Sequence, residues 1–492
     1  MTSWPDAIDA WNEWKDAFIN ICNKCAPVKS TRVKNKKCPW ITPDIVKMIY
    51  KRDYLKAKSD SLQSNEILKE YRKLRNRITG LINKNKHNHF NDITNKYKAD
   101  SKKLWKELQK VTNQNNQTES CNLDCNDTND YFINIGKEIS KSFVHKNNID
   151  WKHPKCIHTF EIQEIQASKI LNYLNCLDNI SHLDILDFDT KLLRLAAPLI
   201  SESLRSIFNA SLKSGVIPSD WKIARTTPVY KGKGNKDDIT NYRPISVVCH
   251  VSKMIEKEVQ LQLLNYLKEH DMINVDQYAF LPHHSTVTCL HRVIDDFHES
   301  LNNKEFVGSC FLDISKCFDC VDHDLLLFKL EKYGIYDKEL KWFSNYITGR
   351  KQLVCFKGKN SAIKELLVGV PQGSGLSPVL FLLFINDISE GLNNTVCSIY
   401  ADDVVIYVTG DNIHDVTLNL QNTVNVLNSW YTRNRLKINI SKTKTMLITT
   451  KSSECLNIYI DHELIEQVHS IRYLGITIHE NLKWNNYLRQ LC

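Results

Sequence analysis

The chain has 492 residues, of which 42% are hydrophobic and 25% charged, a composition that excludes wholesale disorder and suffices for two or three domains. The formal net charge is +9, and residues 28–110 alone hold 23 Lys and Arg residues against eight Asp and Glu residues, so a polyanion is the expected partner. The chain opens without a secretory signal and its longest apolar run, VLFLLFI (379–385), is too short to cross a bilayer, so we expect a cytoplasmic or nuclear protein with no membrane partner.

The first predicted segment, residues 1–110, is helical and basic. Ile8, Trp11, Trp14 and Phe18 recur at spacings of three and four, which indicates an amphipathic helix. From Pro43 onward the pattern predicts a long basic helix or a pair of helices. Its acids are too few to pair its bases, so we interpret this segment as a nucleic-acid-binding surface, with a solvated helical face as the alternative.

A polar segment follows, and its residues 111–130 (VTNQNNQTESCNLDCNDTND) predict a structureless linker. Two cysteine pairs, Cys22 with Cys25 and Cys121 with Cys125, have the spacing of half a zinc site. No Cys/His pair follows at finger spacing, so we interpret the 16 cysteines as reduced, mostly buried thiols. An α/β body is expected to begin near residue 150.

Carboxylates stand at two unusual places in this body. Residues 306–312 form an apolar run typical of a strand, and Asp313 at its end is costly unless it is paired or holds a metal. Asp402 and Asp403 are adjacent in SIYADDVVIYV (398–408), between two strand-forming runs. A divalent cation would relieve their repulsion, and a plain hairpin turn is the alternative. Asp319, in a polar turn, is interpreted as a solvated or capping residue.

Six sequence blocks resemble the reverse transcriptases of non-LTR (LINE-like, jockey-type) retrotransposons, and they occur in the family's order. They are NYRPIS (241–246), FLDISKCFD (311–319), GVPQGSGLSP (369–378), YADD (400–403), LKINISKTKTM (436–446) and YLGITI (473–478). The resemblance implies an α+β fold, a right-hand polymerase of fingers and palm. Its antiparallel palm sheet would be packed by helices and preceded by a mostly helical basic N-terminal region.

The resemblance also implies domain boundaries. These are a basic helical N-terminal region (1–110), a polar linker (111–150), fingers (151–300), a palm with the catalytic carboxylates (301–450), and a primer grip with the start of a thumb (451–492). Full elements of this family carry an endonuclease ahead of the polymerase and a helical thumb after it. We therefore expect an endonuclease-less, C-terminally truncated fragment.

The implied activity is RNA-directed DNA polymerisation, a two-metal nucleotidyl transfer onto a primer 3′-OH. Asp313 and Asp402 would carry two Mg²⁺ ions, for which Mn²⁺ could substitute, with Asp403 as an auxiliary carboxylate and the Ile314 carbonyl completing one coordination sphere. Lys442 is the candidate acid that protonates pyrophosphate, and Lys444 is its rival. The implied partners are an RNA template, a DNA primer and deoxynucleoside triphosphates, and no protein partner is evident.

By the same resemblance, Lys231 and Arg243 would grip the triphosphate of the incoming nucleotide. Gln372 and Gly373 would line its pocket, and the Phe318 ring would collide with a ribose 2′-OH. A further set would form the primer grip: Tyr473, Leu474 and Gly475.

Some positions depart from the family pattern. Cys317 replaces the usual Ala, Ala279 the usual Gly and His284 the usual Arg. If Ala279 needs a positive φ, the strain costs about 1 kcal/mol or more. These departures leave open a catalytically inactive relic that only binds nucleic acid. Phe318 and the YADD turn argue against an RNA-dependent RNA polymerase or a nucleotide cyclase.

Overall fold

The computed structural model describes residues 6–27, 38–98, 100–112, 123–141, 143, 156–180, 182–449 and 455–484. The chain forms two compact units, one of residues 1–25 with 122–492 and one of residues 26–121. No helix of the described ranges is long and apolar enough to cross a membrane.

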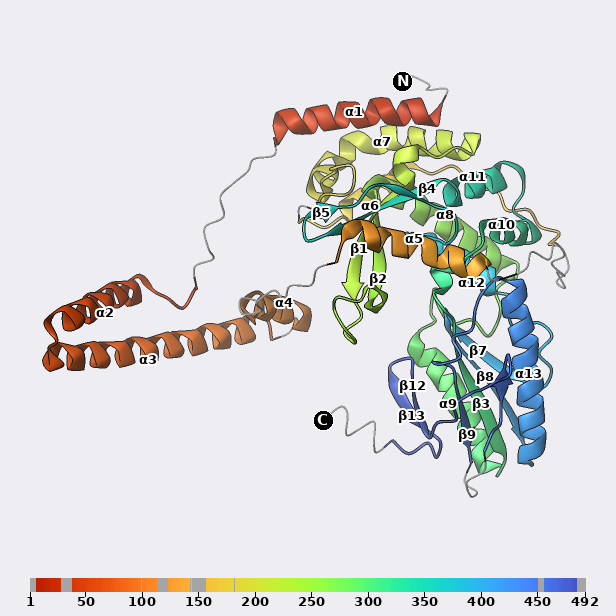
Figure 1. The fold of residues 1–492 in the computed structure, drawn as a ribbon. Helices are drawn as coiled ribbons and strands as arrows, with labels where there is room; N and C mark the ends of the chain where they lie inside the picture. The colour runs from red at the N-terminus through yellow and green to blue at the C-terminus, as the bar shows by residue number, and fades with distance from the viewer. Residues whose placement is uncertain are drawn as a thin grey trace. The chain divides into compact units, whose positions relative to one another are not determined.

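The smaller unit is helical, as its sequence predicts. It contains α2 (Pro43–Leu62), α3 (Asn65–Lys96) and α4 (Ser101–Thr112), and Thr42 caps α2 through the backbone N–H of Ile45. The first two helices pack side by side as a hairpin (Figure 1). Ile45 and Ile78 are the main buried apolar side chains among the described residues of these two helices. Most lysines and arginines of α2 and α3 are exposed to solvent.

Helix α1 (Ala7–Cys25) groups with the larger unit, whereas we expected it to form part of a basic N-terminal region of residues 1–110. It packs on α7 (Thr190–Ser214), and its Trp11 also meets Trp221, which follows α7 in the chain, edge-on with ring centroids 5.1 Å apart. The indole N–H of Trp11 donates to Asp220. Its aromatic face therefore serves the core of the body.

Helix α5 (Cys125–Lys141) lies within the segment that we expected to be a polar linker. Its polar side chains are satisfied by β4 (Arg350–Phe356) and the loop after it. Asn129 donates to the Ala362 carbonyl at 2.9 Å and accepts from Gln352 at 3.0 Å. Phe132 is buried on the same helix. The polar composition was misleading because these Asn groups bond to a neighbouring sheet rather than to water.

A mixed sheet forms the upper part of the larger unit in Figure 1. Its strands run in the order β2-β1-β4-β5, and β6 pairs with β4. The strands are β1 (Ile223–Tyr230), β2 (Tyr242–Val248), β4, β5 (Lys359–Asn360) and β6 (Lys364–Leu366), with the short helices η1 (Ser219–Lys222) and η2 (Ile239–Asn241) flanking β1 and β2. β1 and β2 form a hairpin whose tip holds Lys231 and Arg243.

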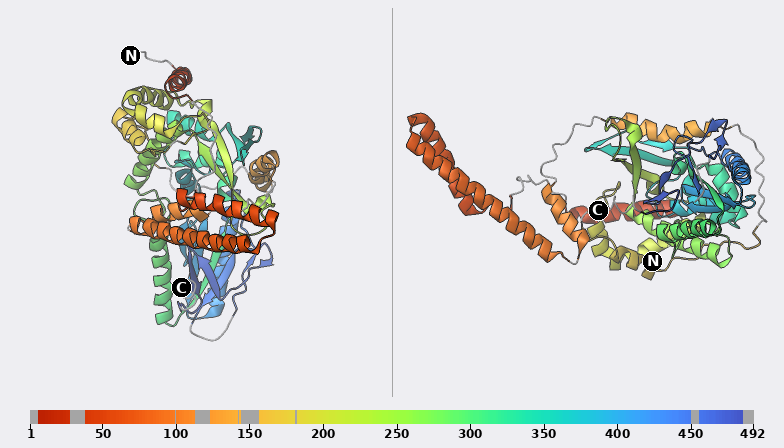
Figure 2. Two further views of the ribbon diagram at one scale, coloured as in Figure 1. Left: turned by 90° about the vertical axis from the view of Figure 1, so that its left-hand side faces the viewer. Right: turned by 90° about the horizontal axis from the view of Figure 1, so that it is seen from below.

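A second, fully antiparallel sheet has the order β7-β8-β3-β9. Its strands are β3 (Phe306–Asp313), β7 (Val396–Tyr400), β8 (Asp403–Gly410) and β9 (Lys444–Ile448). Alternate β3 residues enter different cores: Cys310 joins the one under α13 (Ile413–Arg433), and Phe311 the one under α9 (Thr286–Asn302). Figure 2 shows these two helices beside the sheet, α9 in green and α13 in blue. Both faces are covered, which explains the unbroken apolar run of β3.

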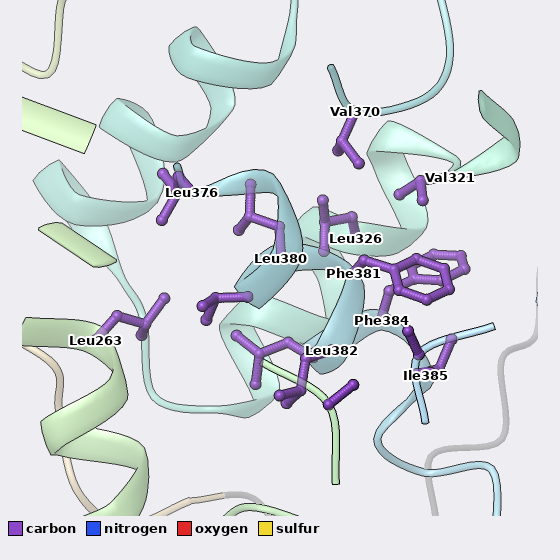
Figure 3. Packing of buried hydrophobic residues seen from close by; sticks show 14 of the residues in the cluster. Leu263, Val321, Leu326, Val370, Leu376, Leu380, Phe381, Leu382, Phe384 and Ile385 are labelled. Carbon is purple, nitrogen blue, oxygen red and sulfur yellow. The ribbon is translucent and has the colours of Figure 1, made fainter. Parts of the chain in front are cut away.

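The largest core surrounds α12 (Ser377–Ile385), in which every residue except Pro378 is buried. Its side chains lie among Leu263, Leu326 and Val370 (Figure 3). The surrounding elements are α6 (Ala167–Asn175), α8 (His250–Glu269), η3 (Cys317–Cys320), α10 (His323–Lys332) and α11 (Asp337–Ile347). Two small hairpins complete the unit: β10 (Tyr459–Ile460) with β11 (Glu463–Leu464), and β12 (Ser470–Tyr473) with β13 (Ile476–His479). The α+β class with helix-packed antiparallel strands is as predicted.

Candidate active site

Three carboxylates meet at one end of the antiparallel sheet. Asp313 is the last residue of β3 and is the register partner of Asp403, the first residue of β8. Tyr400 pairs with Asp403 across the β7–β8 hairpin, so Ala401 and Asp402 form its two-residue turn. Ala401 takes the left-handed φ of 56° that such hairpin turns require. A tight turn beside the end of β3 thus brings together residues far apart in the sequence.

The pKa values of Asp402 and Asp403 are raised mainly by burial and by their neighbouring carboxylates. Asp402 and Asp403 keep solvent-accessible surface, yet the protein around them displaces much of their water. This burial, followed by the charges of Asp402 and Asp313, raises the pKa of Asp403 to about 6. Burial and Asp313 also raise the pKa of Asp402, against the opposing effect of Arg243 and Lys442. Such a site favours a bound cation.

Lys442 contacts the site directly. Its ammonium lies 3.2 Å from Oδ2 of Asp313. Lys444, the rival candidate, pairs instead with Glu466 at 2.9 Å. The backbone beside Asp313 is fixed by an isolated bridge between Ile314 and Ile438, and neither of its two hydrogen bonds, Ser315 N–H to Lys437 and Asn439 N–H to Asp313, uses the Ile314 carbonyl.

Cations from three segments lie near these carboxylates. Loss of surrounding water, followed by the charges of Lys316, Lys442 and Arg243, lowers the pKa of Lys231 to about 8. The ammonium of Lys231 donates to the Thr240 carbonyl at 2.6 Å, which holds the side chain against the loop between β1 and β2. Like charges at such proximity are unfavourable unless an anion joins them.

The predicted pocket residues lie together. Gln372 donates to Asp319 at 2.9 Å, and Phe318 stacks on Phe381 with centroids 4.4 Å apart. Gly373 has a φ of 126°, and a Cβ there would lie 2.2 Å from the Ser246 carbonyl oxygen, so only glycine fits against β2. Burial raises the pKa of Asp319 to about 6 despite Lys316, Gln372 and Lys231 nearby. Asp319 is therefore part of the pocket wall, which the sequence did not indicate.

Glu256 is a second residue that sequence reasoning missed. Its side chain is buried in α8 and accepts from the Ser374 hydroxyl at 2.5 Å, the Gly375 N–H at 3.0 Å and the Ser252 hydroxyl at 3.3 Å. It thereby fixes the glycine-rich loop that carries Gln372. In the sequence Glu256 is one of three glutamates in a mixed polar and apolar helix, and no signal set it apart.

The three primer-grip candidates occupy the β12–β13 hairpin. Leu474 and Gly475 form its turn, with φ values of 45° and 94°, and Gly475 is exposed. The Tyr473 ring is buried, 5.4 Å edge-on from Phe311 and with its hydroxyl 3.6 Å from the thiol of Cys289. The turn is thus the accessible part of this hairpin.

The departures from the family pattern are accommodated. The left-handed residue near Ala279 is Phe280, with a φ of 59°, and Ala279 itself is buried without that strain. His284 is exposed and contacts the Pro282 carbonyl through Nδ1. Cys317 is buried in η3, as a small residue should be.

The donor set suits a hard divalent cation, because carboxylate oxygens are what such ions prefer. Across the described ranges, however, no three Asp, Glu, His or Cys side chains already converge as a metal-holding group. With Lys442 beside Asp313, the charge of this carboxylate is partly balanced by the protein itself.

An antiparallel sheet that ends in three carboxylates, faced by the basic tip of a second sheet, is the arrangement of a palm-and-fingers polymerase. Residues 233–478 match the family described as reverse transcriptase (RNA-dependent DNA polymerase). This match covers half of the chain, and the chain belongs to that family, whose members depend on divalent metal ions.

Two curated relatives support the jockey-type resemblance. The RNA-directed DNA polymerase from mobile element jockey of Drosophila funebris is 29% identical over 312 residues, covering 62% of this chain and 34% of the relative. The probable RNA-directed DNA polymerase from transposon BS of Drosophila melanogaster is 28% identical over 301 residues, covering 58% and 32%. The chain thus spans about a third of each relative's length.

Among solved structures, the chain is similar to telomerase from Candida tropicalis in complex with a fragment of telomeric RNA. The identity is 13%, the TM-score is 0.38, and the match covers 60% of this chain and 53% of the telomerase chain.

Proposed function

We propose that this chain is an RNA-directed DNA polymerase of a non-LTR retrotransposon, which adds deoxynucleotides to a primer 3′-OH on an RNA template. One observation carries the proposal: Asp313, Asp402 and Asp403 lie together at the end of one sheet, close to three cationic side chains. Arg243 and Lys442 act on the pKa of Asp402, and both also act on the pKa of Lys231. Paired carboxylates and phosphate-binding cations are the groups that nucleotidyl transfer needs.

Asp313 and Asp402 would hold two divalent cations, Mg²⁺ or in its place Mn²⁺, with Asp403 as auxiliary carboxylate and the Ile314 carbonyl as a further ligand. Bound there, the ions would stabilise the negative charge on the attacking and leaving oxygens. The raised pKa values of Asp402 and Asp403 support this proposal, because burial and the neighbouring carboxylates make their negative charge costly until a cation binds.

The remaining residues would orient the substrates. Lys231 and Arg243 would bind the triphosphate as a point charge and a planar fork. Lys442 is favoured over Lys444 as the acid that protonates pyrophosphate, because Lys442 contacts Asp313 whereas Lys444 pairs with Glu466. The Phe318 ring would exclude a 2′-OH. Gln372 and Gly373 would line the nucleotide pocket. The primer grip would be formed by Tyr473, Leu474 and Gly475.

We further propose that residues 151–300 act as fingers, 301–450 as palm, and 451–492 as the primer grip with the start of a thumb. The basic unit of residues 26–121 would bind the RNA template or the DNA primer. Its exposed lysines and arginines support this role, because phosphate contacts supply most non-specific affinity.

Extension of oligo(dT) on poly(rA) with dTTP and Mg²⁺ tests the proposal. We expect incorporation that depends on the RNA template and on a divalent ion. If the folded chain binds the template–primer but adds no nucleotide with Mg²⁺ or Mn²⁺, the alternative of a catalytically inactive relic holds.

A further inference from the structure

A helix outside the matched family region touches the candidate active site. α5 packs against β4, β6 and η3, and η3 begins four residues after Asp313. The contact is close at Gly136, where a Cβ would lie 1.9 Å from the carbonyl oxygen of Asp319. The position of α5 therefore fixes the position of the backbone that carries Phe318 and Asp319.

Five residues before Gly136, α5 places an aromatic ring beside a lysine near the site. The ammonium of Lys316 lies 5.8 Å from the centroid of the Tyr131 ring, within the range of a cation–π contact. Lys316 caps η3 with a left-handed φ of 49°, and its carbonyl accepts from the N–H of Asp319 at 2.9 Å. This backbone geometry and the ring together hold the side chain.

Lys316 joins the cations already described. Its charge acts on Lys231, whose ammonium donates to the Thr240 carbonyl in the loop between β1 and β2. Within the described part of the chain, neither Lys316 nor Arg243 forms an ion pair with a carboxylate. Two lysines and an arginine from two sheets thus lie close together, and none of the three is held in an ion pair within the described ranges, although both lysines act on the charge of Asp319. Cations left without an ion pair in this way suit a polyphosphate.

We propose that Lys316, positioned by Tyr131 of α5, is a third cation of the subsite that binds the triphosphate of the incoming nucleotide. α5 is then a part of the nucleotide site and does not merely link the basic region to the body. The inference rests on the proposed polymerase function for the identity of the nucleotide, whereas the polyphosphate chemistry follows from the cations alone.

Lysine acetylation read by mass spectrometry tests the site without requiring activity. The full chain is treated with acetic anhydride, with and without inorganic tripolyphosphate, in EDTA. We expect tripolyphosphate to slow acetylation of Lys231 and Lys316 with the same midpoint. Lys332, whose ammonium also lies over a ring, 4.8 Å from Phe328, is the matched control and should be unaffected. Equal labelling of Lys316 with and without the probe would overturn the proposal.

Two pairs of variants separate positioning from general damage. Tyr131→Leu removes the ring face and should weaken protection of Lys316, whereas Tyr131→Phe keeps it. In primer extension, Lys316→Gln should raise the KM for dTTP about tenfold with little change in kcat, and Lys332→Gln should change neither. An unchanged KM for Lys316→Gln contradicts the inference. If the wild-type chain adds no nucleotide while tripolyphosphate protects Lys316, the polymerase proposal fails and the polyphosphate site stands.

Discussion

Asp313 and Asp403 are register partners at the ends of two adjacent antiparallel strands. The pairing places Asp402, in the turn just before Asp403, at the same end of the sheet. On the other side of β3, Lys442 reaches Asp313 at 3.2 Å. One end of the sheet therefore brings together the three carboxylates and the lysine that the sequence suggested.

The depressed pKa of Lys231 predicts a pH dependence. Its pKa of about 8 means that the side chain is charged below pH 8 and neutral above it. kcat/KM for dTTP should therefore fall as the pH rises through about 8, because this ratio reports the free enzyme. Lys231→Arg, which stays charged, should remove most of this fall, the alkaline limb of the pH profile. A limb that persists in the variant belongs to another group.

Phe318→Ala should admit ribonucleotides, because removing the ring frees space for a 2′-OH. Competition between dTTP and UTP in primer extension measures the effect. Phe280→Ala is the matched control, since this ring meets Phe318 edge-on at 6.3 Å and is partly exposed. Unchanged sugar discrimination in Phe318→Ala removes that ring from the role, and a loss in Phe280→Ala alone transfers the role to it.

Glu256→Ala should destabilise the larger unit. It leaves the Ser374 hydroxyl and the Gly375 N–H without their buried acceptor, which costs about 1–3 kcal/mol for each group. Glu256→Gln keeps a carbonyl acceptor and should cost less. Urea unfolding followed by tryptophan fluorescence compares the two free energies of unfolding. Equal values for Glu256→Ala and the wild type would mean that the loop is held by other contacts.

Gly136→Ala and Gly80→Ala should have opposite effects, although both lie within helices. A Cβ at Gly136 would overlap the Asp319 carbonyl, whereas a Cβ at Gly80 meets nothing within 4 Å. We expect Gly80→Ala to stabilise α3 by roughly 0.5–1 kcal/mol. Gly136→Ala should displace η3 and lower kcat. Hydrogen exchange of α3 and η3, read beside primer extension, checks both, and normal activity in Gly136→Ala would separate α5 from the site.

The basic helices should bind nucleic acid with a strong salt dependence. Replacing Lys69, Arg72 and Lys73 of α3 with Gln should flatten the log–log slope by about 0.7 per lost contact on single strands. A triple change of exposed lysines in the larger unit, Lys257, Lys268 and Lys341, is the control. The α3 variant should leave the Asp313–Asp402 site intact, because the two units are separately compact. Equal slopes in the wild type and the α3 variant would make the arm a solvated spacer.

The sequence predicted the carboxylates because their environment is local. A polar residue at the end of an apolar run, and two acids in a turn between strands, are visible without a fold. The covered faces of the sheet explain why β3 reads as continuous rather than alternating.

Residues that depend on tertiary contacts were missed. Asp319 and Glu256 are common acids in sequence, and only packing shows that one lines the pocket and the other holds the glycine-rich loop. The segment of α5 predicts a linker because its Asn side chains look solvated in the sequence, and only the fold shows that Asn129 bonds to β4 and to the loop at Ala362. The same limit applied to Tyr131, whose lysine partner lies far along the chain.

The most direct test of the central claim compares two Asp→Asn variants of the full chain in primer extension on poly(rA) with Mg²⁺. Asp402→Asn removes a proposed metal ligand, and Asp411→Asn changes an exposed carboxylate just after the far end of β8. We predict that the wild type and Asp411→Asn extend the primer and that Asp402→Asn loses nearly all activity while binding the template–primer normally. Extension by Asp402→Asn at the wild-type rate, or no extension by any of the three folded proteins, would contradict the account.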